Sequence, residues 1–161
     1  MTRTLEGTLD GKGVKVALVV SRFNDAITRR LLSGAEDCLE RHGCSAECRS
    51  VLRVPGAWEL PLAVNRLAER GGFDAIVALG ALIRGETPHF DVLAAQTAKG
   101  LAEVGMRCGV PVIFGVLTTD SLEQAMDRSG SKGGNKGWDA ALSALEMVSL
   151  FRGIEEGRSA R

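Results

Sequence analysis

The sequence predicts an α/β protein, a three-layer α/β/α sandwich around a four-stranded parallel sheet. Four short runs rich in β-branched residues alternate with segments whose apolar residues recur at helical spacing. Most of the helical segments exceed about ten residues, long enough to cross back over a sheet face. With 161 residues and no linker-like stretch, the chain is expected to form one domain over 1–161.

The first half of the chain supplies two strand–helix units. Residues 14–20 are typical of a strand buried on both faces. Asn24 takes the N-cap position of a helix expected over 24–43. A second strand is expected over about 46–54, followed by a helix over 57–71 with a proline in its first turn. Residues 1–13 precede this alternation and form an N-terminal arm, either disordered or added as a strand to a neighbouring subunit.

The second half opens with the clearest strand, residues 75–79. After a loop, Thr87 and Pro88 provide the N-cap and first position of a long helix. Residues 110–117 form the fourth predicted strand.

The rest of the chain is expected to be helical around one glycine-rich loop. Residues 120–123 fit a capping box that opens a short helix. The glycine-rich stretch 130–137 follows, then a final helix from Trp138. We expect the charged tail, residues 154–161, to fray.

Composition and charge exclude several classes of protein. Lys plus Arg equals Asp plus Glu at 20 each, so a nucleic-acid partner is not expected. The chain has no apolar leader and no stretch of ~18 apolar residues, so we expect a cytoplasmic protein without membrane contact. The four cysteines form no CxxC pair and are expected to be reduced thiols. A metal site from His42, Cys44 and Cys48 is not expected, because structural zinc usually takes four protein ligands.

The carboxyl ends of the strands predict the place of the active site, because ligands of open parallel sheets bind there. These ends read SRFN (21–24), VPGAWE (54–59), GALIRGETPH (80–89) and FG (114–115). Aromatic residues make up only 4% of the chain, so their presence at strand ends is informative. We expect the site to centre on 84–89.

The motifs argue against a nucleotide cofactor and for a small phosphate. The turn after the first strand lacks GxGxxG, so no dinucleotide is expected. The glycine-rich loop does not fit GxxxxGK[ST], because Asn135 stands where a glycine is needed. Arg128, Lys132 and Lys136 nevertheless flank a loop before a helix N-terminus, an arrangement that favours phosphate binding.

Most of these residues also have an ordinary structural interpretation. His89 stands at a strand's carboxyl end beside residues 85–87, which favours proton transfer over an exposed helix residue. The alternatives for the others are a hydrophobic staple for Phe23, core packing for Trp58 and Phe114, helix N-terminal charge for Glu59, surface charge for Arg128, and helix-dipole pairing for His42. Taken alone, the residues predict an enzyme for a small planar substrate and a phosphate ester, without naming the reaction.

Four motifs in order resemble those of the 6,7-dimethyl-8-ribityllumazine synthase family. They are SRFN (21–24), VPGAWELP (54–61), GALIRGETPHF (80–90) and GGNKG (133–137), and the likeness runs from about 5 to 152. It implies a flavodoxin-like fold and a transferase of riboflavin biosynthesis that needs no cofactor. The implied reaction condenses 5-amino-6-(D-ribitylamino)uracil with 3,4-dihydroxy-2-butanone 4-phosphate, releasing phosphate and water.

The resemblance also implies a role for each candidate residue. Phe23 would stack on the pyrimidine; Ala57, Trp58 and Glu59 would line the ribityl side; Ala81, Leu82 and Ile83 would offer backbone contacts; Glu86 and Thr87, with Arg128 from an adjacent subunit, would hold the phosphate; His89 would transfer protons; Phe114 would be a wall against the ring; and Lys136 would add positive charge.

The resemblance further implies a homo-oligomer. The family forms pentamers, and the short connection over 130–137 resembles that of members that close into 60-subunit shells. The segment FDVLAAQT (90–97) lacks an Asn-Glu pair common in the family, and we expect only a packing variation there. Two rival functions stay open at this point, an archaeal-type riboflavin synthase on the same fold and a non-catalytic flavin-binding shell protein.

Overall fold

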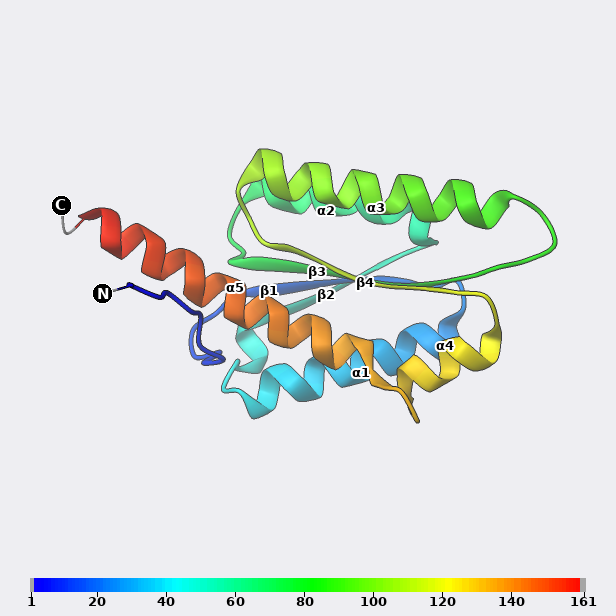
Figure 1. The fold of residues 1–161 in the computed structure, drawn as a ribbon, viewed down its shortest axis with the longest axis horizontal. Coiled ribbons are helices and arrows are strands. Elements are labelled where there is room, and N and C mark those ends of the chain that lie inside the picture. The colour runs from blue at the N-terminus through cyan, green and yellow to red at the C-terminus, as the bar shows by residue number, and fades with distance from the viewer. Residues whose placement is uncertain (1, 160–161) are drawn as a thin grey trace.

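Four parallel strands form the centre of the molecule, which the computed structural model describes over residues 2–159 (Figure 1). They are β1 (Val16–Ser21), β2 (Arg49–Val54), β3 (Ala75–Ile83) and β4 (Val112–Thr119). Their spatial order is β2-β1-β3-β4 and every pairing is parallel, so the predicted sheet is confirmed. The order reverses at β1, which puts the switch point of a flavodoxin-like sheet between β1 and β3.

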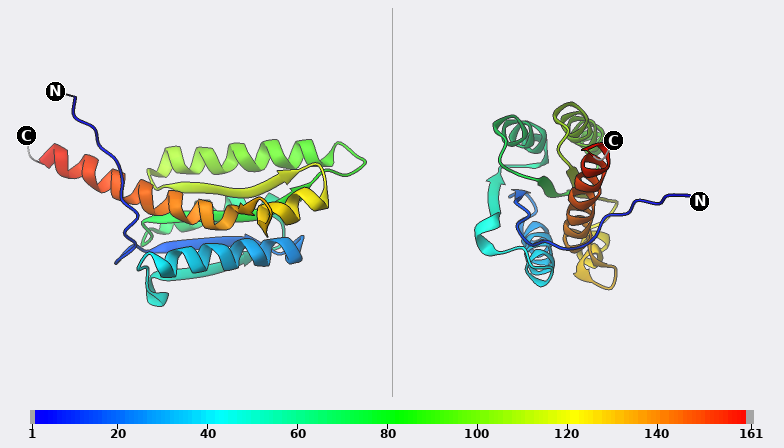
Figure 2. Two further views of the ribbon diagram at one scale, coloured as in Figure 1. Left: turned by 60° about the horizontal axis from the view of Figure 1, so that its bottom comes forward. Right: turned by 90° about the vertical axis from the view of Figure 1, so that its left-hand side faces the viewer.

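Helices cover both faces of the sheet, as predicted. In Figures 1 and 2, α2 (Leu60–Arg70) and α3 (His89–Cys108) lie on one face. The other face carries α1 (Asp25–Arg41), α4 (Leu122–Arg128) and α5 (Lys136–Ser159). Each face has its own cluster of buried apolar side chains, so the three layers follow from two separate hydrophobic cores.

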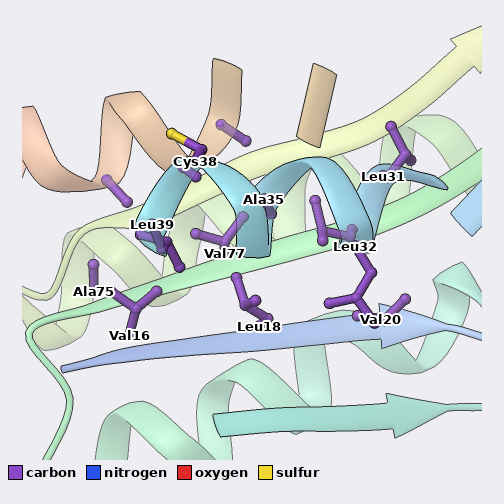
Figure 3. Close-up of a cluster of buried hydrophobic side chains, with 14 of the residues drawn as sticks. Val16, Leu18, Val20, Leu31, Leu32, Ala35, Cys38, Leu39, Ala75 and Val77 are labelled. Carbon is purple, nitrogen blue, oxygen red and sulfur yellow. The ribbon is translucent and has the colours of Figure 1, made fainter. Parts of the chain in front are cut away.

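Strand periodicity builds the core under α1 (Figure 3). Val16, Leu18 and Val20 alternate along β1 and point to the same face as Leu31 and Leu39 of α1. Leu18, Leu31 and Leu39 are fully buried, and burying a leucine side chain stabilises a fold by about 1.5–3 kcal/mol. This packing fixes α1, and with it the loop that follows β1.

Four short elements complete the chain. The 3-10 turn η1 (Ala46–Cys48) precedes β2, and η2 (Ala57–Glu59) precedes α2. The glycine-rich stretch forms a small hairpin of β5 (Ser129–Ser131) and β6 (Gly134–Asn135). The hairpin leads directly into α5, so the predicted loop contains paired backbone.

The strand boundaries differ from the prediction in ways that matter for the site. β3 runs on to Ile83, because residues 80–83 pair with 116–119 of β4. β4 therefore ends at Thr119, and the expectation that Phe114 and Gly115 mark its carboxyl end is wrong. Both residues lie in mid-strand, since no glycine or proline follows to end the strand after them.

The helix starts differ by about one residue. Pro88, not Thr87, is the N-cap of α3, and His89 is its first helical residue. Ser121 caps α4 by accepting a hydrogen bond from the Gln124 N–H at 3.1 Å. The predicted capping box at 120–123 was thus set one residue too early.

The N-terminal arm crosses α5 (Figure 2). Thr8 donates its backbone N–H to Ser149 Oγ at 2.9 Å, so the arm packs along α5 within this chain. α5 continues to Ser159, so the described part of the tail expected to fray is helical, and residues 160 and 161 lie outside the described residues. Within residues 2–159, no helix is long and apolar enough to cross a membrane.

Candidate active site

A cleft of about 720 Å³ opens where β1, β2 and β3 end. The loops after β1 and β2, the end of β3 and the first turns of α3 form its walls. Nine of the predicted site residues line it: Phe23, Ala57, Trp58, Glu59, Ala81, Leu82, Ile83, Thr87 and His89. The prediction that strand ends gather these side chains holds for three of the four strands.

Two aromatic side chains in this cleft are open to solvent. Phe23 is 70% exposed and Trp58 is 58% exposed, so neither is part of the core. Two exposed aromatic rings that border the same cleft are typical of a surface that a ligand or a partner covers. Both rings are therefore available to stack on a planar ligand.

Hydrogen bonds between its backbone and two side chains hold the loop after β2. The Gly56 N–H donates to Glu59 Oε2 at 3.0 Å, which fixes the carboxylate at the start of η2. The Thr97 hydroxyl donates to the buried Ala57 carbonyl at 3.4 Å. Glu59 thus serves the start of a helix, as the ordinary interpretation proposed, and also borders the cleft.

Asn24 borders the cleft in a role that the sequence analysis missed. It has a left-handed backbone (φ 60°) and makes no side-chain cap to α1. Its side-chain amide instead donates to the Ala81 carbonyl at 2.8 Å. Asparagine tolerates this backbone conformation better than most residues. That tolerance is the only feature of the sequence that could have indicated this role for Asn24.

The segment 84–89 is exposed along its whole length. Within residues 2–159, the side chains of Glu86, Thr87 and His89 have no hydrogen-bond or ion-pair partner, and Glu86 is not among the residues that line the cleft. These side chains are free to meet a ligand.

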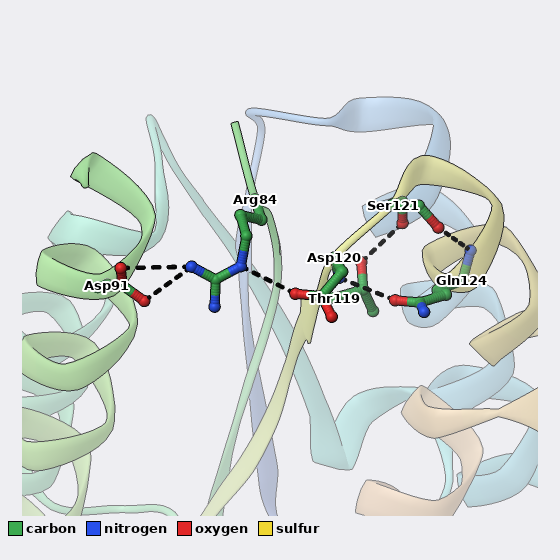
Figure 4. Close-up of polar contacts among 6 residues, drawn as sticks. All are labelled: Arg84, Asp91, Thr119, Asp120, Ser121 and Gln124. Carbon is green, nitrogen blue, oxygen red and sulfur yellow. Dashed lines mark hydrogen bonds and ion pairs between the residues drawn. The ribbon is translucent and has the colours of Figure 1, made fainter. Parts of the chain in front are cut away.

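Arg84, at the start of this segment, forms ion pairs with two carboxylates (Figure 4). It binds Asp120 at 2.9 Å and Asp91 at 3.1 Å. The hydrogen bond to Asp120, then that to Asp91, raises the pKa of Arg84 above its usual value.

A second hollow of about 360 Å³ follows the open edge of β4. Phe114, Arg128 and Lys136, the remaining predicted residues apart from Glu86, line it. Arg128 donates to the Gln124 carbonyl at 3.2 Å, and Lys136 pairs with Asp139 at 3.2 Å. The hollow shares no lining residue with the cleft, so one chain keeps the two sets of candidate residues apart.

Cys38, Cys44 and His42 make contacts inside the fold. Cys44 Sγ donates to the Val14 carbonyl at 3.2 Å, and His42 Nδ1 lies 2.7 Å from the Cys38 carbonyl oxygen. The described residues contain no group of three or more metal-ligating side chains. Burial, reinforced by Asp37 and Asp139, raises the pKa of Cys38 to about 11.

Comparison with known proteins gives one consistent result. The family model for 6,7-dimethyl-8-ribityllumazine synthase matches residues 13–152. A protein of that name from Chlorobaculum tepidum is 56% identical over 150 residues, which cover 93% of this chain and 97% of the relative. Relatives of the same name from Chlorobium chlorochromatii and Pelodictyon phaeoclathratiforme are each 54% identical, over 92% and 94% of this chain and 96% and 98% of their own lengths.

Proposed function

The chain belongs to the 6,7-dimethyl-8-ribityllumazine synthase family, and from that premise we propose the reaction and the site that follow. The enzyme is a transferase that condenses 5-amino-6-(D-ribitylamino)uracil with 3,4-dihydroxy-2-butanone 4-phosphate, with loss of phosphate and water. This is the penultimate step of riboflavin biosynthesis. The observation that carries the proposal is a match over nearly the whole chain together with a cleft lined by nine of the expected residues.

The cleft is proposed to hold the pyrimidine substrate. Phe23 stacks on its ring, while Ala57, Trp58 and Glu59 face the ribityl chain. β3 extends past its last pairing with β1, at Leu79. Backbone groups on that edge of residues 81–83 therefore have no strand neighbour. The Ala81 carbonyl already accepts from Asn24, and the other groups on this edge are available to hydrogen-bond the heterocycle.

The exposed segment after β3 is proposed to receive the phosphate ester. Thr87 contributes its hydroxyl, and Glu86 contributes its backbone N–H, because a carboxylate repels a phosphate. Arg128 of an adjacent subunit supplies a planar, permanently charged partner for phosphate oxygens. Lys136 adds a second positive charge near it, and Phe114 forms a wall against the ring.

His89 is proposed to move protons during the reaction. The substrate amine attacks the ketone carbonyl, and loss of water gives an imine. Elimination then breaks the C–O bond to the phosphate and leaves an enol, which tautomerises to a ketone. The ribitylamino nitrogen attacks this ketone, and loss of a second water closes the ring. Each step transfers a proton, and imidazole is suited to do so near neutral pH. Holding two substrates together supplies much of the remaining acceleration.

We propose that each complete site forms between two subunits of a pentamer, and that pentamers close into a 60-subunit shell. The separation of the cleft from the hollow supports the shared site. The short connection between α4 and α5 supports the shell. We further propose a cytoplasmic enzyme, consistent with four free cysteines.

The reaction is tested by supplying both substrates and measuring phosphate release and lumazine absorbance. Formation of both above the spontaneous rate is the expected result. Riboflavin formed from lumazine alone would identify a riboflavin synthase instead. Tight binding of lumazine or riboflavin with no turnover would identify a non-catalytic protein.

The shared site is tested by mixing two impaired variants and assaying them with the butanone phosphate well below the raised KM of Arg128→Ala. His89→Ala subunits keep Arg128, and Arg128→Ala subunits keep His89. If the site spans two subunits, roughly a quarter of the interfaces in a random one-to-one mixture unite both intact residues. Recovery of activity only after dissociation and reassembly is expected, and no recovery would contradict the shared site.

A further inference from the structure

Arg84 joins two loops that carry different parts of the proposed site (Figure 4). Its Nε donates to Asp120 Oδ1 at 2.9 Å, in the connection between β4 and α4. Its Nη1 donates to both oxygens of Asp91, at 3.1 and 3.3 Å, in the first turn of α3. The guanidinium also lies 4.5 Å from the ring centroid of the buried Phe90, which is favourable for a cation over an aromatic face.

On the α3 side, these contacts link Arg84, at the start of the segment 84–89, to Asp91, just after its end. The segment leaves β3 at Arg84 and enters the core at Phe90, and every residue between them is exposed. Within residues 2–159, none of Glu86, Thr87 and His89 has a polar side-chain partner. The Arg84 side chain is therefore the polar tether that spans this segment.

On the α4 side, the contacts continue to the helix that ends in Arg128. The Asp120 N–H donates to Gln124 Oε1 at 2.8 Å, and the Gln124 N–H donates to Ser121 Oγ at 3.1 Å. Arg128 Nη1 in turn donates to the Gln124 carbonyl at 3.2 Å. A continuous set of hydrogen bonds thus runs from the segment 84–89 to Arg128.

Neither stability nor direct phosphate binding explains this arrangement well. Arg84, Asp91 and Asp120 are all solvent-exposed, and exposed ion pairs contribute little to folding. Two carboxylates already neutralise the single guanidinium, and the cluster as a whole is negative, so it repels a phosphate. The fork of Arg84 is suited instead to hold two loops at a fixed distance, because it bonds two carboxylates at once.

We propose that Arg84 is a positioning residue that holds the segment 85–89 and the Arg128-bearing helix α4 in one fixed relation. Resting on the proposed function, this role joins two different sites. The segment 85–89 serves the subunit's own cleft, and Arg128 serves the cleft of its neighbour. Arg84 thus holds a segment of one site and the Arg128 helix of the next site around the ring at a fixed distance from each other.

The first test is Arg84→Met, which keeps an unbranched apolar stem in place of the aliphatic part of arginine and removes the guanidinium. We expect the KM for the butanone phosphate to rise roughly tenfold, because small displacements of positioning groups are costly. The kcat is expected to fall as well, because the displaced segment also carries His89, while the thermal midpoint is expected to stay within about 2 °C. An unchanged KM, or a lower thermal midpoint without a KM effect, would overturn the positioning role.

Two further variants separate charge from bridging. Arg84→Lys is expected to restore the wild-type KM only in part, because one compact ammonium does not replace two separate nitrogens that each bind a different carboxylate. Full restoration would overturn the bridging role. Arg41→Met is the matched control. Arg41 forms a similar exposed pair with Asp37 at 2.9 Å but lies at the end of α1 remote from the cleft. The KM of Arg41→Met for the butanone phosphate is therefore expected to match that of the wild type.

Mixed oligomers test whether Arg84 acts on both sites. In the His89→Ala plus Arg128→Ala mixture, working sites use the cleft of the Arg128→Ala chain and the hollow of the His89→Ala chain. Adding Arg84→Met to the Arg128→Ala chain tests its effect on the segment 85–89. Adding Arg84→Met to the His89→Ala chain tests its effect on α4. We expect a raised KM in both mixtures. An unchanged KM in either one, or no activity in the parent mixture, would overturn the joint role, whereas failure of the wild type to form lumazine would refute the proposed function itself.

Discussion

Replacing Phe23 with alanine should weaken binding of the pyrimidine substrate without harming the fold. The ring is 70% exposed, so its removal leaves no core cavity, and surface changes of this kind usually alter stability by no more than about 0.5 kcal/mol. Taking ~200 Å² for a whole phenylalanine, about 140 Å² is exposed, and a ligand on one face covers about half of that. At ~25 cal/mol per Å² this corresponds to ~1.7 kcal/mol, or about a 20-fold change in affinity.

The assay is steady-state lumazine formation with each substrate varied in turn. Phe23→Ala is expected to raise the KM for the ribitylaminouracil about 20-fold and to leave the KM for the butanone phosphate nearly unchanged. Phe23→Tyr keeps the ring and serves as the matched control, with a KM close to that of the wild type. An unchanged ribitylaminouracil KM in Phe23→Ala, or an equal rise for both substrates, would refute stacking by Phe23.

Three other predictions concern residues in different surroundings. His89→Ala should lower kcat by about 100-fold and leave the particle size by light scattering unchanged, since the side chain is exposed; an unchanged kcat would remove His89 from the mechanism. Arg128→Ala should chiefly raise the KM for the butanone phosphate, by about tenfold or more, and equal binding of that substrate would refute the assignment. Burial, then the charges of Asp37 and Asp139, raises the pKa of Cys38 from 9.0 to about 11, so the folded state holds this proton more tightly than the unfolded chain does. The resulting stability is present below pH 9 and lost as the pH rises towards 11, and Cys38→Ala should therefore show a smaller fall in urea midpoint over that range; an identical fall would show that Cys38 is not its source.

Hydrophobic periodicity in the sequence predicted most of the fold. The runs at 14–20 and 75–79 became β1 and the first part of β3, because strands buried on both faces must be apolar throughout. The helices were equally readable, since each buries one apolar stripe against the sheet. Gathering Phe23, Trp58 and His89 in one cleft then required only that parallel strands end at the same edge.

Contacts between distant segments could not be predicted in this way. Nothing local to Arg84 indicates that it binds Asp120, which is 36 residues away. Asn24 fits an N-cap by its neighbours, but its side chain turns to Ala81 on β3 instead. Such choices depend on which polar groups the finished sheet leaves within reach, and a linear pattern does not record them.

The position of Phe114 supports the proposal that the complete site draws on more than one chain. Phe114 pairs with Ala78 of β3, whereas the cleft begins at Ala81, three residues and roughly 10 Å further along the strand. β4 is an edge strand, and the hollow beside Phe114 follows it from Ile113 to Thr119 without sharing a lining residue with the cleft. We infer that a centre containing both Phe114 and His89 forms only when the edge of one subunit meets the strand ends of another. A closed ring of such head-to-tail contacts gives every subunit one complete site, and an isolated subunit then has none.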